Sequence, residues 1–442
     1  MEGPIYKDAI DIYKAGLAAA NAMRAVARAV VRKDPDTLLV AGNPVDLGKF
    51  RKVFVVGAGK AACPMAKALE DALGERLEGG LVVTKYGHAK RLSKVEVVEA
   101  DHPVPDTRGL SGVRRVMKIV ESAGPTDLIF CLLSGGGSAL WPLPAEGLSL
   151  HEKQTTTDLL LKSGARIFEI NAVRKHLSAI KGGHLARAAY PARVISLMLS
   201  DVIGDDPAVI ASGPASPDPS TFAEALEVLS RHGLVSRVPK PVLAHLEKGR
   251  RGEIPETPKP GDPVFEKVEQ HLVGSLRLSL AAAKEAALAK GYNTVILSAA
   301  VEGEAREAAK VLAAVAREIR ETGNPLAPPA CVLAGGETTV TVRGGGTGGR
   351  NLEAALSAAL ALSGMKDVLF LSCGTDGADG PTNAAGTWVD GRTAGQARAN
   401  GLSPEAFLAA NDSYNFFKEL KGLIVTGPTL TNVMDLMVIL VR

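Results

Sequence analysis

The chain lacks the features that would place it in a membrane, outside the cell or on nucleic acid. No stretch reaches the roughly 18 uninterrupted apolar residues that a membrane-spanning helix needs, and Glu2, Lys7 and Asp8 stand where a secretion signal would be hydrophobic. The charges nearly balance, at 51 Lys and Arg against 48 Asp and Glu, and no dense basic run occurs. We therefore expect a cytoplasmic protein whose partners include neither membrane nor nucleic acid.

The chain is also poor in cysteine. The four cysteines are far apart, and most stand within or beside apolar runs; they are Cys63, Cys131, Cys331 and Cys373. This pattern indicates reduced core residues, neither a disulfide framework nor a zinc site. With 442 residues, of which 46% are apolar, the chain is long enough for two or three domains with a sizeable core.

The first half alternates short apolar runs with segments of helical spacing. A strand at 53–56 is followed by a helix at 61–73 and a strand at 81–84, and the order repeats with a strand at 95–98, a helix at 109–122 and strands at 128–133 and 194–199. Repeated βαβ units predict an α/β domain with a parallel sheet. Before them, residues 6–32 have the spacing of one long amphipathic helix, which could pack on either domain.

A proline-rich passage with the charged cluster 248–251 separates the halves, so we place the junction near residue 250, between domains 1–250 and 251–442. Beyond it the sequence again predicts α/β structure. The expected helices cover 276–290, 304–321 and a segment after Arg350, and the expected strands cover 294–298, 330–333, 338–342, 368–373 and 433–441.

The most informative segment is the glycine-rich stretch 335–351 of the second half. Glycines expose backbone N–H groups to anions, and Arg350 adds a planar, permanently charged fork. The candidate binding residues here are Glu337, Thr338, Gly348, Gly349 and Asn351. The alternative interpretation is a mobile hairpin loop.

A second glycine turn, with Gly57, Gly59 and Lys60, matches the GxGxxA form of the dinucleotide fingerprint. The match is weak, because Val83-Thr84-Lys85 offers no acidic residue for a ribose. It is not a Walker A loop either. An ammonium in the first turn of a helix is disfavoured by the helix dipole, so Lys60 is either an anion-contacting residue or a surface residue.

A third glycine turn follows the strand at 128–133, at the end of the strand where α/β sheets bind ligands. Ser134, Gly135, Gly136, Gly137 and Ser138 could form a nest for phosphate or carboxylate, or only a tight turn.

Helical spacing brings basic residues together a little further along the chain. Asn171, Arg174 and Lys175, with Lys181 nearby, could form a basic clamp for an acidic substrate or a solvated face.

Carboxylates end two of the predicted strands. Asp201, followed by Asp205 and Asp206, ends one strand, and Asp376 and Asp379 follow another. Asp201 and Asp376 are our candidate Mg²⁺ ligands. Turns and helix caps explain these residues equally well.

Taken together, the motifs resemble the two-domain glycerate 2-kinases over nearly the whole chain, and the second half resembles the MOFRL domain. The motifs are VVGAGKAA, DHPVPD, LLSGGGSAL, INAVRKHLS, LSDVIGDD, GGETTVTV, GGRNLE and SCGTDGADGPTNAAG. The resemblance implies ATP-dependent phosphorylation of D-glycerate at the 2-hydroxyl, with a divalent metal such as Mg²⁺. It also implies a Rossmann-like first domain and an active site in the cleft between domains.

The resemblance implies that Lys60 and Arg350 are the catalytic residues, since they stand at the family's lysine and arginine positions. We expect the loops 134–138 and 344–349 to cradle phosphates and the segment 171–181 to hold the glycerate carboxylate. Two other functions compete: an NAD(P)-dependent hydroxypyruvate reductase, suggested by the GxGxxA turn, and a non-catalytic sensor of acidic metabolites. The sequence is compatible with a monomer and with a homodimer.

Overall fold

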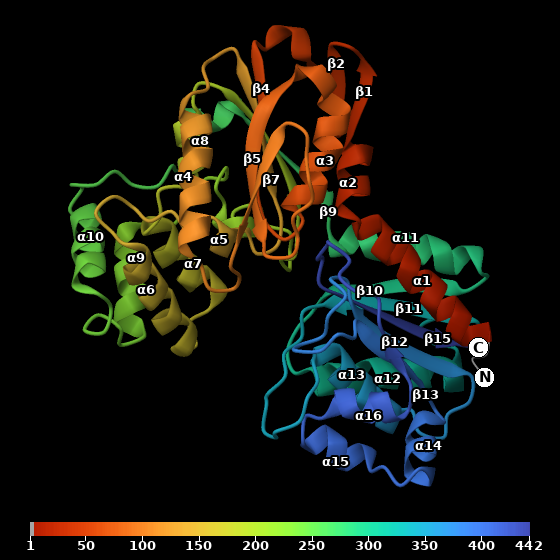
Figure 1. Ribbon diagram of the computed structural model, residues 1–442. Helices are drawn as coiled ribbons and strands as arrows, with labels where there is room; N and C mark the ends of the chain where they lie inside the picture. The colour runs from red at the N-terminus through yellow and green to blue at the C-terminus, as the bar shows by residue number, and fades with distance from the viewer. Residues whose placement is uncertain (1–3) are drawn as a thin grey trace. The chain divides into compact units, whose positions relative to one another are not determined.

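The computed structural model describes residues 4–442, which divide into two units (Figure 1). The amino-terminal unit is Ala22–Val273, and the carboxy-terminal unit combines residues 4–21 with Gly274–Arg442. The junction expected near residue 250 lies instead between Val273 and Gly274. The reason is that strand β9 (Val268–Gly274) still pairs within the first sheet. Within residues 4–442, no helix has the length and apolar character needed to cross a membrane.

The amino-terminal unit is organised by a six-stranded sheet of order β6-β5-β4-β7-β8-β9. Besides β9, its strands are β4 (Lys52–Ala58), β5 (Leu77–Lys85), β6 (Val95–Ala100), β7 (Asp127–Leu133) and β8 (Arg193–Leu199). The pairs from β6 through β8 are parallel, as the βαβ pattern predicts. Numbered along the chain, the strands lie in the order 3-2-1-4-5-6 of a Rossmann fold, whose ligand crevice lies where the order reverses, here between β4 and β7.

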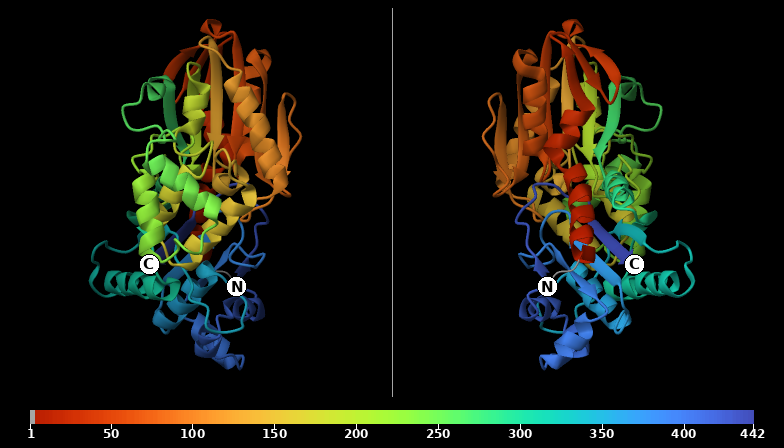
Figure 2. Two further views of the ribbon diagram at one scale, coloured as in Figure 1. Left: turned by 90° about the vertical axis from the view of Figure 1, so that its left-hand side faces the viewer. Right: turned by 90° about the vertical axis from the view of Figure 1, so that its right-hand side faces the viewer.

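Helices cover both faces of this sheet (Figures 1 and 2). Helix α4 (Thr107–Glu121) and helix α8 (His184–Ala189) share one buried apolar cluster with alternate residues of β4, β5 and β7. Helix α3 (Ala62–Leu73) packs on β4, β5 and β7 as well, and α2 (Ala22–Ala29) packs on α3. A small antiparallel sheet is formed by β1 (Val30–Asp34), β2 (Thr37–Val40) and β3 (Asn43–Asp46). The short helices of the unit are η1 (Leu47–Lys49), η2 (Gly74–Arg76), α5 (Gly137–Leu140), η3 (Ile210–Ser212) and η4 (Pro263–Lys267).

Four further helices form a separate apolar cluster within the amino-terminal unit. They are α6 (Leu150–Lys162), α7 (Ile167–His176), α9 (Phe222–Arg231) and α10 (Lys240–Arg250). Helices α6 and α7 carry the basic side chains of Lys153 and Arg174.

The carboxy-terminal unit is a mixed sheet of order β10-β11-β15-β12-β13-β14. The strands are β10 (Asn293–Val301), β11 (Ala330–Gly336), β12 (Val368–Gly374), β13 (Gly386–Asp390), β14 (Leu423–Ile424) and β15 (Asp435–Val441). Strand β15 runs antiparallel to both β11 and β12, so Asp435 at its start pairs with Gly336 and Gly374 at their ends. This register brings the carboxyl ends of β11 and β12 together with the start of β15.

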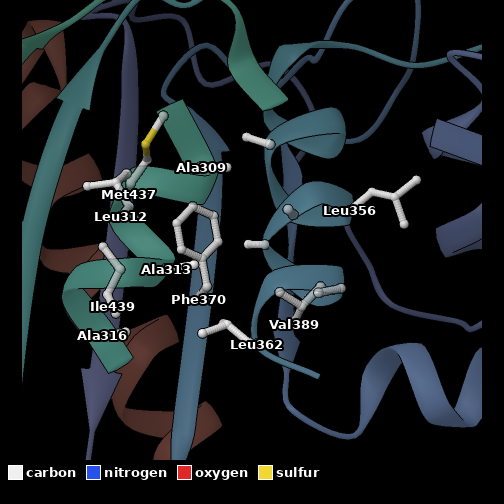
Figure 3. Close-up of a cluster of buried hydrophobic side chains, with 14 of the residues drawn as sticks. Ala309, Leu312, Ala313, Ala316, Leu356, Leu362, Phe370, Val389, Met437 and Ile439 are labelled. Carbon is white, nitrogen blue, oxygen red and sulfur yellow. The ribbon is translucent and has the colours of Figure 1, made fainter. Parts of the chain in front are cut away.

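Both faces of this sheet are covered, and its central strands are entirely buried. Helices α1 (Pro4–Ala20) and α11 (Leu276–Ala289) lie on one face, with α12 (Ala305–Thr322) and α13 (Arg350–Ala361) on the other (Figure 1). Figure 3 shows part of the apolar core between this sheet and helices α12 and α13, with Phe370 of β12 beside Ala313 of α12. The remaining helices are α14 (Thr393–Ala399), α15 (Pro404–Ala409) and α16 (Ser413–Glu419).

Two predicted elements are corrected by the structure. The helix expected at 6–32 is broken: α1 packs in the carboxy-terminal unit, α2 in the amino-terminal unit, and the last residues form β1. The strand expected at 338–342 is absent apart from one bridge at Thr339. Side chains from other segments bind the backbone that would pair with a neighbouring strand: Thr341 donates its N–H to the Glu304 carboxylate, and its carbonyl accepts a hydrogen bond from Asn411 Nδ2 at 3.4 Å.

Candidate active site

One candidate site, in the amino-terminal unit, lies at the ends of β4 and β7, the strands between which the sheet order reverses. The two loops are hydrogen-bonded to each other: Lys60 N–H donates to the Gly135 carbonyl at 2.8 Å, and Ala61 N–H donates to Ser134 Oγ at 3.1 Å. Ser134 is buried. The loops at 57–62 and 134–138 therefore form one hydrogen-bonded structural unit, and Lys60 belongs to it.

Two glycines make this close approach feasible. Gly59 has φ +135°, and a Cβ there would lie 2.1 Å from Ser134 Oγ. Gly136 has φ +83°, and its Cβ would lie 2.9 Å from the His102 ring and 3.6 Å from Lys60 Cγ. Both positions require glycine for conformation and for space. His102 thus belongs to the surroundings of Lys60, although it was not among the predicted site residues.

The structure does not support a phosphate cradle at the turn 57–62. The N–H groups of residues 59 to 62 all donate to protein acceptors. In the neighbouring loop, by contrast, the N–H groups of Gly135, Gly136 and Ser138 have no acceptor among residues 4–442. The backbone N–H groups without an acceptor in the described part of the chain are therefore those of the second loop, and Gly57 and Gly59 allow close packing against Leu132 and Ser134.

The neighbours of Lys60 are neutral imidazoles. Burial, with Lys60 and Lys85 nearby, lowers the pKa of His102 to about 4. Burial also lowers the pKa of His88, whose Nδ1–H donates to the Lys60 carbonyl at 3.0 Å. Since both rings are uncharged near neutral pH, the positive charge of this region resides on its lysines.

Further basic side chains line an adjoining cavity of about 420 Å³. Arg174 donates to Ser138 Oγ, and Lys181 Nζ donates to the Ser138 carbonyl at 2.7 Å. Lys153 of α6, which the sequence analysis did not identify, lines the same cavity. The structure thus brings Arg174 and Lys181 of the expected basic clamp together with Ser138 of the expected phosphate loop, and it adds a third cation.

Two members of the predicted basic clamp lie elsewhere. Lys175 is buried and pairs with Asp218 at 3.2 Å, and Asn171 Oδ1 accepts a hydrogen bond from Ser212 at 3.1 Å. Neither lines the cavity with Arg174 and Lys181. The even helical spacing suggested one face for all of these residues, but the side chain of Lys175 follows its buried counterion.

A second candidate site lies in the carboxy-terminal unit, where β11 and β12 end beside the start of β15. Arg350 is held by two carboxylates: Nε and one terminal nitrogen donate to Asp435 at 2.5 and 3.1 Å, and the other donates to Glu337 at 2.7 Å. Asp435 is buried, whereas Glu337 is exposed. The two acidic neighbours raise the pKa of Arg350 against the opposing effect of burial, so this fork is firmly charged and oriented.

The start of α13 has a second set of backbone N–H groups without an acceptor among the described residues. Asp379 accepts hydrogen bonds from the N–H groups of Asn351 and Leu352, which leaves those of Gly348, Gly349 and Arg350 with no acceptor among residues 4–442. They border a cavity of about 620 Å³. The buried hydroxyl of Thr338, which also lines this cavity, has no hydrogen-bond partner within 4–442.

Asn351 does not reach this cavity. Its side chain is buried, donating to Asp379 and accepting a hydrogen bond from Ser372 at 2.7 Å. It links the start of α13 to Asp379 and to Ser372 of β12, so its side chain is not one of those that line the cavity.

No metal centre is formed by the described residues. Within 4–442, no group of three or more His, Cys, Asp or Glu side chains is arranged to hold a metal ion. Asp379 is occupied as the cap of α13. Asp376 lines the cavity beside Arg350, with Oδ1 accepting the N–H of Ala378, and Asp201 follows β8 in the other unit.

Sequence reasoning missed Lys153, His102 and Asp435. His102 lies in the DHPVPD motif and Asp435 begins an apolar strand, where a lone acid is itself a signal, because a buried carboxylate needs a partner. Lys153 lies in an ordinary polar helix segment and gave no signal.

The chain belongs to the MOFRL-type glycerate kinase family. Its residues 8–247 match the model of a domain of unknown function, DUF4147, and residues 330–435 match that of the MOFRL family. Together these regions contain both candidate sites.

Individual relatives bear kinase and reductase names. The chain is 47% identical over 388 residues to a D-glycerate 2-kinase of Thermotoga maritima, covering 88% of this chain and 90% of that protein. A relative from Agrobacterium vitis with a hydroxypyruvate reductase name is 43% identical over 427 residues, covering 96% and 95%. The crystal structure of a glycerate kinase from Thermotoga maritima superposes with a TM-score of 0.88 at 44% identity, covering 99% of each chain.

Proposed function

We propose that this protein transfers the γ-phosphoryl group of ATP to the 2-hydroxyl of D-glycerate, giving 2-phosphoglycerate and ADP. The observation that carries the proposal is the position of Lys60: it follows β4, where the strand order reverses, on a loop that is hydrogen-bonded to the 134–138 loop, and Ser138 of that second loop lines the basic cavity. Phosphoryl transfer asks mainly for positioning and for positive charge around the migrating group.

In this proposal Lys60 and Arg350 both stabilise the transferring phosphoryl group. The ammonium is a compact point charge, and the guanidinium is a fork held at a fixed angle by Asp435. The free N–H groups of the 134–138 loop and of the α13 start bind phosphate oxygens. Arg174 and Lys181 hold the glycerate carboxylate.

Magnesium, in this proposal, arrives with the nucleotide. Mg²⁺ prefers one or two carboxylates, water and substrate phosphate over a cage of protein ligands. Asp376, on the cavity that borders Arg350, suits such a site, whereas Asp379 does not. The ion would neutralise phosphate charge.

The reductase name of one relative makes hydride transfer from NAD(P)H the second candidate. Two features of the amino-terminal unit argue against it. The N–H groups at the GxGxxA turn are bonded within the protein, and β5 ends in Thr84 and Lys85 without an acid for the ribose.

The functions are separated by two incubations, one with D-glycerate, ATP and Mg²⁺ and one with hydroxypyruvate and NADH. ADP formation that depends strictly on glycerate supports the kinase, and phosphorus NMR of the product distinguishes 2- from 3-phosphorylation. Loss of NADH without ADP formation refutes the proposal. Binding of glycerate without turnover would indicate a sensor.

The role of Lys60 is tested by Lys60→Ala, which we expect to lower kcat roughly 10³-fold or more, by analogy with removing a cation from a phosphoryl-transfer site. Lys60→Arg should also fail, because a planar fork does not replace a compact ammonium. Lys67→Ala, an exposed lysine of α3 paired with Asp71, is the control. A Lys60→Ala enzyme with nearly normal kcat would remove Lys60 from the reaction.

A further inference from the structure

Three cations from different elements meet at one cavity of the amino-terminal unit. Lys153 comes from α6, Arg174 from α7, and Lys181 from the segment before α8. The sequence places Lys153 far from the glycine loops and outside the basic segment 171–181. Only the packing of α6 beside α7 brings its ammonium to the cavity.

Two of these cations are almost completely buried. Lys153 exposes 5% of its surface and Lys181 1%. Their ammonium groups donate to backbone carbonyls, Lys153 to Leu143 at 3.0 Å and Lys181 to Ser138 at 2.7 Å. Neutral carbonyls satisfy hydrogen bonds but do not neutralise charge.

No counterion accompanies this charge. Among residues 4–442, no carboxylate contacts Lys153, Arg174 or Lys181, and the one carboxylate that lines the cavity, Asp158, is exposed and bonded to Lys162 at 2.8 Å. Burial and mutual repulsion lower the pKa values of Lys153 and Lys181 well below the usual range. Such a cluster is costly in the empty protein and becomes favourable when an anion enters.

Lys175 provides the contrast within the same unit. It is also a buried lysine, and its charge is compensated by Asp218 at 3.2 Å. The fold therefore supplies a counterion for the lysine that faces away from the cavity, and the lysines that face the cavity have none.

We propose that Lys153 is a substrate-binding residue that, with Arg174 and Lys181, binds the carboxylate of the hydroxy-acid substrate and excludes neutral polyols. This inference rests on the proposed function and extends it to a residue outside the motifs. Pro103, Val104, Leu150 and Leu161 form an apolar wall of the same cavity, which leaves the cations as its anion-recognising part. One cation is thus contributed by each of α6, α7 and the segment before α8.

The test compares the full-length wild type with Lys153→Met and Lys153→Arg, and uses Lys67→Met, an exposed lysine of α3 paired with Asp71, as the control. Initial rates are measured with D-glycerate varied at saturating ATP, and then with ATP varied at saturating glycerate. We expect Lys153→Met to raise the KM for glycerate about tenfold to a hundredfold, the loss of one charge-assisted hydrogen bond. The KM for ATP should not change, and Lys153→Arg should recover most of the affinity.

Thermal unfolding separates binding from a structural role. Removing an uncompensated buried charge should leave the Tm of Lys153→Met without ligand unchanged or higher, whereas removing a structural anchor would lower it. Glycerate should raise the Tm of the wild type and fail to raise that of Lys153→Met at the same concentration.

Each failure has its own signature. If wild-type protein forms no glycerate-dependent ADP, the proposed function falls. If wild-type protein is active and Lys153→Met keeps its KM for glycerate, or raises the KM for ATP instead, the assignment of Lys153 to the carboxylate is overturned while the kinase remains.

Discussion

The two units carry their functional cations in opposite ways. In the carboxy-terminal unit, Arg350 is anchored by Asp435 and Glu337. In the amino-terminal unit, the cations around the cavity, Lys153, Arg174 and Lys181, have only neutral partners among the described residues. A compensated cation is rigid and stays charged without ligand, whereas an uncompensated cluster gains its counterion from the ligand.

This difference indicates a division of labour. A fork held at a fixed angle suits a transition state, where charge must be met without reorganisation at the moment of reaction. A cluster that lacks a counterion suits recognition, because the favourable energy appears only when an anion of the right shape enters. If the two kinds of cation differ in this way, their removal should have different effects on kcat, on KM and on stability.

The largest effect should come from Arg350→Ala. We expect kcat for glycerate-dependent ADP formation to fall roughly 10³-fold or more, as when the arginine of a phosphoryl-transfer site is lost. The KM for glycerate should change little if Arg350 acts mainly on the transition state. Arg392→Ala, an exposed arginine of the same unit paired with Asp390, is the control. A raised KM with unchanged kcat would make Arg350 a recognition residue and remove the contrast.

An intermediate effect should come from Lys175→Met, measured as the free energy of unfolding in urea. The change leaves Asp218 buried without its cation, so we expect a loss of about 3 kcal/mol, at the low end for broken buried pairs. Asp218 keeps hydrogen bonds from Ser220 and Thr257. Lys153→Met, measured in parallel, should show no such loss. Equal destabilisation of both variants would mean that buried lysines here do not differ in compensation.

The smallest effect concerns pH and His102. Its pKa is about 4 in the folded protein and near 6.5 when unfolded, through burial and the nearby Lys60 and Lys85, with Asp101 opposing. The unfolded chain therefore binds more protons between these values, so stability rises with pH across the window and is lost as pH falls through it. We expect His102→Gln to reduce the loss between pH 7 and 5 by about 1 kcal/mol, after allowance for partial exposure.

The control for His102 is His184, whose pKa burial also lowers to about 4 and which lies near Arg187. His184→Gln should flatten the pH dependence separately, and the two changes should add if the sites are independent. The free energy of unfolding of His102→Gln is measured in urea at pH 5, 6 and 7. If it falls as steeply with decreasing pH as that of the wild type, the His102 ring beside Gly136 is accessible to protons and its pKa is not lowered in the folded protein.

Much of the fold could be predicted from the sequence because its signals are local. The apolar runs at 53–56 and 128–133 are short and continuous, as strands buried on both faces must be, and both lie within observed strands. The strand expected at 338–342 shows the limit of this reasoning. Its alternating pattern is real, but Glu304 accepts the N–H of Thr341 and Asn411 donates to the Thr341 carbonyl, and both residues are distant in sequence.

The residues of the candidate sites were likewise predictable from the sequence only in part. Ser138, Arg174 and Lys181 were predicted from their motifs and share one cavity. Lys175, adjacent to Arg174 in sequence, was assigned to the same clamp wrongly. One residue along a helix changes direction by about 100°, and the partner that decides its place, Asp218, belongs to a different segment.

The sequence by itself determined the alternation of strands and helices and the glycine turns that follow the strands, because these depend on residue spacing and backbone conformation over a few neighbours. Only the tertiary structure decided which cations are compensated. Asp435 reaches Arg350, Asp218 reaches Lys175, and no carboxylate among residues 4–442 reaches Lys153. Charge compensation depends on distance in space, and residues remote along the chain supply it.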